Sequence, residues 1–428
     1  MWENERRNEM IRNIVIGIIL LAVVVGLAFG YLAVRQRIRE EDEQLKQVQS
    51  SQRQELSDAR QENKELINQV YQQHQDVLSQ YLPGIVCWGD SLTTGSSGNV
   101  SYPHTLQKYL DVYICDIYDL RYSLDTVEGL SAQDWDDYKI SIPVVNMGAG
   151  REDAITILGR SGVIPYVVDT NLVIPAEIES IPVAIKSEDG KTVTPLIAGD
   201  GGINPVTIAG VQGTLTRNAS TQQWSEYVYQ FTRLEAGTEV AVEKGTQVVT
   251  AATNAYQDYI HIVWLGTYGT FSNPDKLVND TRALLQRQSI NTERYLVISP
   301  CTYNGSWQMA SPYAMDAIDS AMLQAFGDRY INLRKYLIED GLRDANISAT
   351  TLDKQSIANG NVPDSFRSNT NGADLNGVAY ELLGKLVYER MDRLGYLTEV
   401  REELNLEKSI QEILKEDSKY FENRLNAY

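Results

Sequence analysis

The longest apolar stretch of the chain lies close to its N-terminus. Residues 13–34 carry no charged side chain, and Ile14–Val34 has the composition of an apolar helix. At about 1.5 Å per residue, a helix of this length crosses a hydrocarbon core of roughly 30 Å. It is longer than the ~7–15-residue apolar core of a cleaved signal peptide. The pattern therefore predicts an uncleaved, single-pass membrane anchor.

The stretch that follows is polar and contains neither proline nor glycine. Residues 35–81 are rich in Gln, Glu, Arg and Ser, and apolar residues return at alternating heptad positions. This pattern predicts a helical stalk, which is either a weak coiled coil that joins copies of the chain or a solvated single helix. Leu82-Pro83-Gly84 ends the helix. The apolar positions are Ile38, Leu45, Leu56, Ala59, Leu66, Val70 and Val77.

Beyond the stalk, short apolar runs alternate with helical patterns. Alternation of this kind predicts a parallel sheet with helices on both of its faces. The expected strands are Ile85–Trp88, Ile142–Val145, Ile260–Leu265, Tyr295–Ser299 and Tyr330–Leu333. The expected helices are Tyr102–Leu110, Asp275–Gln288, Pro312–Ala325 and Gly377–Leu394.

One long stretch, Gly159–Ala255, interrupts this alternation. Short β-branched runs dominate it, and turn sequences such as Ser187–Gly190 and Gly199–Gly202 separate several of them. We interpret the stretch as an all-β module inserted into the α/β domain, because the parallel-sheet pattern resumes at Tyr259. The expected strands are Ile181–Lys186, Thr192–Ile197, Val206–Thr216, Glu226–Leu234 and Glu239–Val249.

An aromatic stripe lies within this module. Tyr227, Tyr229 and Phe231 share one face of an expected strand, and Trp224 comes just before them. Such a stripe is either part of a core or a platform on which sugars stack, and we favour the core.

Composition narrows the classes of function. The chain has 428 residues, 43% of them hydrophobic, so it can bury a core of more than one unit. Its net charge of −19 argues against nucleic acid as a partner, because phosphate binding needs clustered lysine and arginine. Cys87, Cys115 and Cys301 lack the spacing of metal ligands, so we expect buried thiols and no metal site.

The candidate chemistry begins at Ile85–Gly95, where an apolar run breaks into a turn of small residues that presents Ser91. The sequence Gly89-Asp90-Ser91-Leu92 resembles the first block of the SGNH, or GDSL, hydrolase family, with Ser91 at the nucleophile position. Asn146-Met147-Gly148 is similar to the second block. The resemblance implies that the Gly148 N–H is a donor of the oxyanion hole. It also implies a flavodoxin-like three-layer α/β/α domain over about residues 84–395, outside the insert, without metal or organic cofactor.

Two later blocks depart from the family pattern. Where the family has Gly-x-Asn, this chain has Gly266-Thr267-Tyr268, so Tyr268 either fills space or donates a hydrogen bond from its hydroxyl. Where the family has Asp-x-x-His, this chain has Asn371 and Asp374. By this resemblance, both the catalytic base and the carboxylate that orients it are replaced.

The missing histidine matters because a serine hydroxyl needs a base. Imidazole, with a reference pKa of about 6.5, suits that role better than a carboxylate at about 3.9. The chain has three histidines. His74 lies in the stalk, and His261 lies ~16 Å along a strand from the site end at ~3.3 Å per residue. His104 is either an alternative base at the edge of the cleft or a polar residue of a first helical turn.

Three functions remain open. The first is a pseudoenzyme that binds an acylated or glycan ligand of the cell envelope, or a protein partner. The second is an esterase or acyltransferase in which Asp374 or His104 activates Ser91. The third is a structural component of a membrane assembly that acts through its anchor and stalk. We favour the first because the usual base is absent, which leaves Ser91 as either a residual turn serine or an unconventional nucleophile.

The expected organisation places the N-terminus inside the cell and the main domain outside, as in related exported esterases. The arginines that flank the anchor on both sides do not decide the orientation. The expected segments are an N-terminus (1–13), a transmembrane helix (14–34), a stalk (35–82), a first part of the SGNH-like domain (83–158), the β insert (159–255), a second part (256–396) and a helical tail (397–428).

Overall fold

The computed structural model describes residues 2–95, 100–118, 141–218, 229–266, 273–287, 294–301, 312–368 and 374–400. The chain divides into two units, Met1–Val70 and Tyr71–Tyr428. The tail expected at 397–428 lies outside the described residues from 401 onwards.

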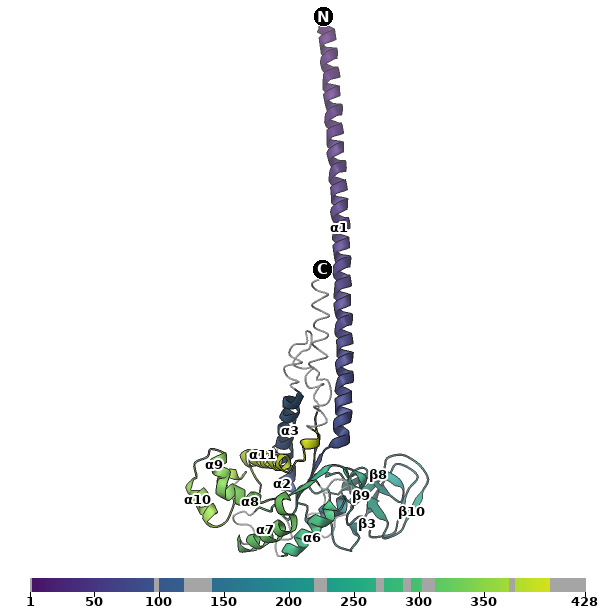
Figure 1. Cartoon of the computed structure of the whole chain (residues 1–428). Helices are drawn as coiled ribbons and strands as arrows, with labels where there is room; N and C mark the ends of the chain where they lie inside the picture. Colours follow the sequence, from purple (N-terminus) through teal and green to yellow (C-terminus); the bar gives the residue numbers. More distant parts are fainter. Residues whose placement is uncertain are drawn as a thin grey trace. The chain divides into compact units, whose positions relative to one another are not determined.

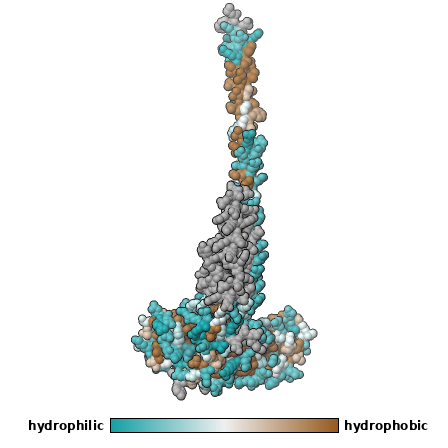
Figure 2. Space-filling model, in the orientation of Figure 1, coloured by the Kyte–Doolittle hydropathy of each residue, from teal (hydrophilic) through white to brown (hydrophobic). Residues whose placement is uncertain are grey.

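The first unit is formed by helix α1 (Trp2–Tyr81), whose last turns belong to the second unit. The uncharged run Ile14–Val34 lies within α1, and its large apolar side chains are exposed. Figure 2 shows this run as a brown band on the helix. Within the described part of the chain, this one helix is long and apolar enough to span a membrane.

The stalk is helical, as its pattern predicts. Ile38 and Leu45, two of the heptad positions, are exposed in the single chain, and the side chains of the later heptad positions lie outside the described residues. The last turn of α1 is anchored in the second unit, where Leu78 is buried and Gln75 donates a hydrogen bond from Nε2 to the Ser141 carbonyl at 3.3 Å. The helix ends at Tyr81, directly before the Leu82-Pro83-Gly84 sequence that predicts its end.

The second unit is built on a five-stranded sheet in which all strands are parallel. Read from β2, the strands follow the chain order 2-1-3-4-5, which is one of the common doubly wound orders. Gly89 pairs with Gly148 on one side and with Trp264 on the other, so three strands end at one level. The strands are β1 (Ile85–Gly89), β2 (Val144–Gly148), β12 (Ile260–Trp264), β13 (Tyr295–Ile298) and β14 (Tyr330–Ile331).

Helices cover both faces of this sheet (Figure 1). On one face, the Trp264 ring meets Tyr102 of α3 at a centroid distance of 5.8 Å, and α3 packs along α11. On the other face, Val263 packs in a core with Leu277 and Ile318 from α6 and α7. The parallel sheet between two helical layers predicted from the sequence is therefore observed. The covering helices are α3 (Tyr102–Tyr118), α5 (Ala154–Arg160), α6 (Pro274–Leu285), α7 (Pro312–Phe326) and α11 (Gly377–Arg393).

Shorter helical segments connect these elements. They are α2 (Ser91–Thr94), η2 (Ala251–Asn254), η3 (Gly327–Arg329), α8 (Leu333–Tyr336), η4 (Leu337–Gly341), α9 (Leu342–Asp344), α10 (Thr351–Ala358) and η5 (Asp364–Phe366).

The predicted β module is a seven-stranded antiparallel sheet with a two-stranded ribbon beside it. Its order is β5-β9-β8-β7-β11-β3-β6, and the two outer strands, β5 and β6, are separated in the chain by Ala184 alone. Because neighbouring residues occupy its two edges, the sheet is nearly closed on itself around a core of its own. The strands are β3 (Tyr166–Val168), β4 (Leu172–Ile174), β5 (Ser180–Val183), β6 (Ile185–Ser187), β7 (Val206–Ile208), β8 (Val211–Arg217), β9 (Tyr229–Arg233), β10 (Val240–Val242) and β11 (Gln247–Val249).

The aromatic stripe of the module belongs to its core. Tyr229 and Phe231 are fully buried, and the Tyr229 hydroxyl donates a hydrogen bond to the Pro195 carbonyl at 3.2 Å. Trp224 and Tyr227 lie outside the described residues. The interpretation of the stripe as core is confirmed for the two described members.

The strand predicted at Thr192–Ile197 is wrong. The backbone there is irregular and makes a turn at Pro195 and Leu196. Proline supplies no N–H for a ladder, and Leu196 adopts a φ of 62°, which reverses the extended backbone. Val193 is nevertheless buried, so the segment's apolar character serves packing without strand pairing.

Three further runs, each predicted as one strand, form two strands each in the structure. Val206–Thr216 is broken at Ala209 and Gly210, whose φ values of 48° and 81° make a tight hairpin turn. The run Glu239–Val249 is broken at Gly245, which has a φ of 90°, and Ile181–Lys186 is broken at Ala184. The apolar pattern continues through the breaks at Ala184 and Ala209, and Ala209 is not a typical turn residue, whereas the break at Gly245 lies in the polar run Glu243–Gln247.

Gly213 tests whether the module's core is packed to its limit. A Cβ at this position in β8 would lie 2.3 Å from two ring atoms of Phe231. We expect Gly213→Ala to lower the free energy of unfolding by about 1–3 kcal/mol, because overpacking displaces the buried ring. Urea unfolding followed by circular dichroism measures this. Thr216→Ala, exposed on the same strand, is the control, and equal unfolding midpoints for the two variants would contradict the expectation.

Candidate functional site

The turn that carries Ser91 begins where β1 ends. Asp90 is the N-cap residue of α2, and its buried carboxylate accepts a hydrogen bond from the Leu92 N–H at 2.9 Å. The Asp90 carbonyl accepts further bonds from the Thr93 and Thr94 N–H groups at 3.1 and 3.0 Å. Asp90 therefore fixes the first turn of α2, and the half-buried Ser91 is the first residue of that helix.

Gly148, the expected oxyanion donor, lies at the end of β2 directly against this turn. A Cβ on Gly148 would lie 2.3 Å from the Thr94 nitrogen, so only glycine fits here. The Gly148 N–H donates to Asn146 Oδ1 at 2.9 Å, and Asn146 Nδ2 donates to the Thr94 carbonyl at 3.3 Å. The N–H that the family resemblance assigns to an oxyanion is therefore engaged by a side chain of its own strand.

The β module reaches the serine turn through Ala198. Gly150, two residues beyond β2, donates its N–H to the Ala198 carbonyl at 3.0 Å. A Cβ on Gly150 would lie 3.0 Å from the Ala198 Cβ and 4.0 Å from the Ser91 Cβ. Ala198 and Ser91 therefore flank the same small space, and the module forms a wall beside the serine.

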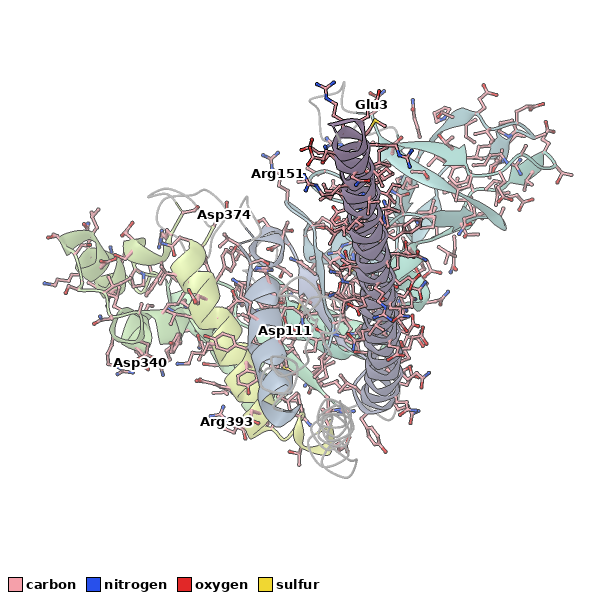
Figure 3. All side chains as sticks on the ribbon, turned by 90° about the horizontal axis from the view of Figure 1, so that it is seen from above. Glu3, Asp111, Arg151, Asp340, Asp374 and Arg393 are labelled. Atoms are coloured by element: carbon pink, nitrogen blue, oxygen red, sulfur yellow. The ribbon has the colours of Figure 1, made fainter. Side chains whose placement is uncertain are left out.

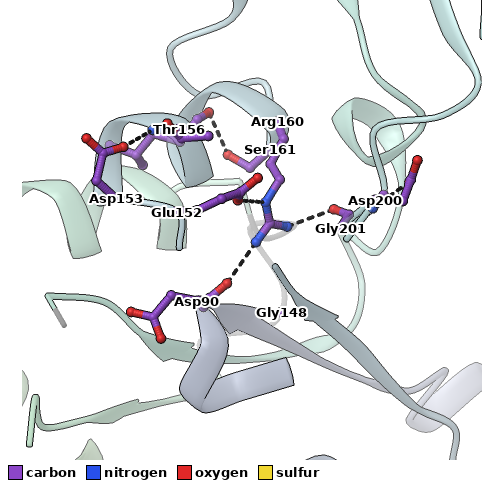
Figure 4. A network of polar contacts seen from close by, with 12 residues as sticks. Asp90, Gly148, Glu152, Asp153, Thr156, Arg160, Ser161, Asp200 and Gly201 are labelled. Atoms are coloured by element: carbon purple, nitrogen blue, oxygen red, sulfur yellow. Dashed lines mark hydrogen bonds and ion pairs between the residues drawn. The ribbon is translucent and has the colours of Figure 1, made fainter. Parts of the chain in front are cut away.

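A buried arginine joins the module to the end of β1 (Figure 4). The fully buried Arg160 guanidinium donates from Nη2 to the Gly89 carbonyl at 2.9 Å and from Nη1 to the Gly201 carbonyl at 2.7 Å. Its Nε donates to Glu152 Oε2 at 2.6 Å, and the guanidinium lies 5.4 Å from the centre of the Trp88 ring. One side chain thus connects β1, the segment after β2 and the module loop.

The carboxylate of this pair is as buried as the arginine. Burial raises the pKa of Glu152 from 4.5 to about 7, because loss of hydration outweighs the attraction of Arg160. The charges of Asp153 and Asp200 raise this pKa further. Among the described residues, Glu152 Oε1 has no hydrogen-bond partner. The pair is therefore held at a considerable electrostatic cost beside the serine turn.

Asp374 lies at the N-terminal end of α11, two residues before its N-cap residue Asn376 (Figure 3). Burial raises the pKa of the Tyr380 hydroxyl in α11, and the carboxylates of Asp374 and Asp90 raise it further. The carboxylates of Asp374, at the expected histidine position, and of Asp90, the cap of the serine turn, therefore both act on the Tyr380 hydroxyl.

The histidines lie in other settings. His261 is buried on β12, where its Nε2 is 2.9 Å from the Tyr256 carbonyl and burial lowers its pKa to about 4. His104 is exposed on the first turn of α3, and its backbone N–H donates to Ser101 Oγ at 3.4 Å. The side chain of His74 lies outside the described residues. Neither described imidazole has a hydrogen bond to Ser91 among the contacts of the described residues.

Two predicted site residues, Tyr268 and Asn371, lie outside the described residues. Of the third block only Gly266 is described, with a φ of 99°. The thiols of Cys87 and Cys301 are buried, and burial raises the pKa of each to about 12. Within the described ranges, no three His, Cys, Asp or Glu side chains are grouped so that they could hold a metal ion.

Sequence reasoning missed Glu152 and Arg160. Glu152 lies two residues before the short apolar helix α5 and Arg160 is its last residue, and charged residues at helix ends are commonly solvated caps. The sequence does contain an indication of their burial. The segment Ala154–Gly159 between them has no polar side chain except Thr156, which indicates a helix that is buried on all sides. Charged residues next to such a helix need partners inside the protein.

No protein-family model matches the chain, and no curated protein matches it either. The arrangement of the site therefore supplies the argument about chemistry. A serine lies at the carboxyl edge of a parallel sheet, where α/β folds commonly bind ligands, and the two glycine N–H groups beside it, of Gly148 and Gly150, are bonded within the protein.

Gly148 provides a direct test of how closely β2 packs on the serine turn. We expect Gly148→Ala to lower the free energy of unfolding by about 1–3 kcal/mol, because the new methyl group meets backbone atoms that cannot rotate away. Thermal unfolding measures the effect. The control is Gly377→Ala, whose nearest contact would be an ordinary 3.4 Å from Val100. Equal losses of stability in the two variants would show that the serine turn moves to make room for the added methyl group, which would contradict the expectation.

The raised pKa of Glu152 predicts a pH dependence of stability. The folded chain holds this proton up to about pH 7, whereas the unfolded chain releases it near 4.5. Stability therefore falls as pH rises between these values, by about 3 kcal/mol from this group. We expect Glu152→Gln to remove that part of the decrease, measured as urea unfolding at a series of pH values. Asp169→Asn, at a partly exposed ion pair, is the control, and identical pH profiles for wild type and Glu152→Gln would refute the expectation.

Proposed function

We propose that this chain is a membrane-anchored relative of the SGNH hydrolases whose serine site binds a ligand without hydrolysing it. The strand order 2-1-3-4-5 supports a flavodoxin-like SGNH domain. The serine turn after β1, the glycine block after β2 and Asp374 before the last described helix support the same assignment. These positions agree with the order of the family's blocks along the chain.

The observation that carries the non-hydrolytic part of the proposal is the hydrogen bond from the Gly148 N–H to Asn146 Oδ1. An oxyanion hole works when its donors point at the site of developing charge, and the loss of one donor typically costs about 10²–10³ in turnover. In this chain a carboxylate also occupies the expected histidine position at Asp374. A carboxylate in place of the histidine, together with an engaged donor, favours binding over hydrolysis.

The expected ligand is an acylated or glycan component of the cell envelope, or a protein partner there. The apolar helix α1 would hold the chain in the membrane, with the N-terminus inside and the main domain outside. Exposed Ile38 and Leu45 would allow copies of the chain to associate through the stalk. Such association would also suit a structural role in a membrane assembly.

A second candidate is an active acyl hydrolase or acyltransferase that uses Asp374 as the base. It is favoured by one observation, namely that Asp374 and Asp90 both act on the buried Tyr380 hydroxyl. A carboxylate at Asp374 would become a stronger base if a bound substrate removed water from it.

Fluorophosphonate labelling of the full chain in detergent separates these functions. We expect no Ser91-dependent labelling of the wild-type chain, with Ser91→Ala as the background. We expect Asp374→His to label, because an imidazole at this position supplies the base. Asp275→His, which adds a histidine on the exposed start of α6, is the matched control and should stay silent.

Labelling of the wild-type chain that disappears in Ser91→Ala would overturn the binding proposal in favour of the active enzyme. If Asp374→His is also silent, Asn146→Ala in that background tests whether the engaged Gly148 N–H is the remaining obstacle. Silence of this double variant would contradict an intact serine site.

A further inference from the structure

The Arg160 guanidinium is bonded to three oxygens that belong to three different parts of the fold. They are the Gly89 carbonyl at the end of β1, the Gly201 carbonyl in the module loop and the carboxylate of Glu152. Gly89 is two residues before Ser91, and Gly201 lies three residues after Ala198. The planar guanidinium holds its N–H groups at fixed angles, so the three oxygens are held in one arrangement.

The Gly89 carbonyl is constrained from a second side. It also accepts a hydrogen bond from the Ala149 N–H at 3.1 Å. A displacement of Arg160 therefore changes the position of β1 relative to the segment after β2, and the serine turn begins at this point. Arg160 has no exposed surface, so water does not replace a bond that it loses unless the packing opens.

The module loop makes a second, separate contact with the same region. The Gly150 N–H donates to the Ala198 carbonyl at 3.0 Å, next to the Ser91 side chain. Glycines at 199, 201 and 202 adopt φ values of 128°, 56° and 82°, so this loop has a backbone that few other residues accept. One end of the loop thus lies beside the Ser91 side chain, and its other end is hydrogen-bonded to Arg160.

We propose that Arg160 is a positioning residue that couples the module loop Ala198–Gly202 to the Ser91 turn, so that displacement of one loosens the other. The proposal takes the Ser91 turn as the ligand site and in that respect rests on the proposed function. Its test needs no ligand and no catalysis, so the two proposals fail separately. A ligand that touches the β module would in this way change the geometry at Ser91.

The charge of Glu152 determines how firmly this connection holds. Four titratable groups face Glu152. They are Arg160 in α5, Asp153 at the N-cap of that helix, Asp200 in the module loop and the Tyr166 hydroxyl in β3. Burial raises the pKa of Glu152 from 4.5 to about 7, whereas a hydrated Glu152 in an opened state keeps its ordinary value. Rising pH therefore favours opening between these two values, and protonation favours the closed arrangement.

Amide hydrogen exchange of the full chain in detergent tests the coupling. The reporters are the turn amides of Thr93, Thr94 and Gly95 and the loop amides of Gly202 and Ile203, all bonded within their own segments. We expect Arg160→Lys to lower the protection of both sets by about tenfold, because the single ammonium nitrogen cannot occupy the three separate positions from which Nε, Nη1 and Nη2 each bond one oxygen. Amides of α11 should keep their protection.

The pH series distinguishes positioning from a general structural role. In the wild-type chain, protection of both reporter sets, corrected for intrinsic exchange, should fall together as pH rises through the interval 4.5 to about 7. Glu152→Gln should abolish this fall. The matched control is Asp319→Asn, which removes the charge of another acid paired with a buried arginine, Arg334, away from the module.

Two results would overturn the proposal. One is that Arg160→Lys loosens the turn without the loop, or the loop without the turn. The other is that the pH dependence of the two reporter sets persists unchanged in Glu152→Gln. If Arg160→Lys fails to fold, the comparison of wild type, Glu152→Gln and Asp319→Asn still decides the question.

Discussion

The contact between the parallel sheet and the β module depends on the buried pair formed by Arg160 and Glu152. A charge removed from water costs several kcal/mol, and this cost is tolerated only where the charge is bonded on several sides. Arg160 meets the condition by donating to Gly89, Gly201 and Glu152 at once. The parallel sheet and the β module are therefore one structural unit at this point, although each has an apolar core of its own.

This arrangement changes how the insertion is understood. A module placed in a loop of an α/β domain usually extends from the scaffold and tolerates change. Here the loop Ala198–Gly202 returns to the carboxyl edge of the sheet, where α/β folds bind their ligands. The insert therefore contributes a wall to the candidate site, and its fold and the shape of that site cannot vary independently.

Much of the α/β scaffold could be predicted from the sequence because its strands are buried on both faces. Ile85–Gly89 and Ile260–Trp264 are buried throughout, and such runs are continuous and apolar. The β module was harder, since its hairpin at Ala209 and Gly210 depends on two positive φ values within an apolar pattern. The turn at Leu196 is likewise set by tertiary packing, which a local propensity does not contain.

The places of the candidate residues in the fold could be predicted for a similar reason, whereas their roles stay a prediction. Ser91, Gly148 and Asp374 stand in recognisable sequence blocks, and each lies at the carboxyl edge of the sheet or at the start of α11. The groups that contact these residues are in part distant in sequence. Arg160 contacts Gly89 across 71 positions of the chain, a pairing that no local pattern indicates.

The packing also bears on what the Gly89-Asp90-Ser91 sequence means. A Cβ on Gly89 would lie 2.1 Å from Thr93 Oγ1 and 2.8 Å from the Trp264 carbonyl, so the fold itself requires glycine there. Asp90 is required as the cap of α2, whether or not Ser91 reacts. Two residues of the block are thus explained by architecture, and their presence does not argue for catalysis. The distinction between an enzyme and a binding protein therefore depends on the groups around the turn, namely the engaged Gly148 N–H and the carboxylate of Asp374.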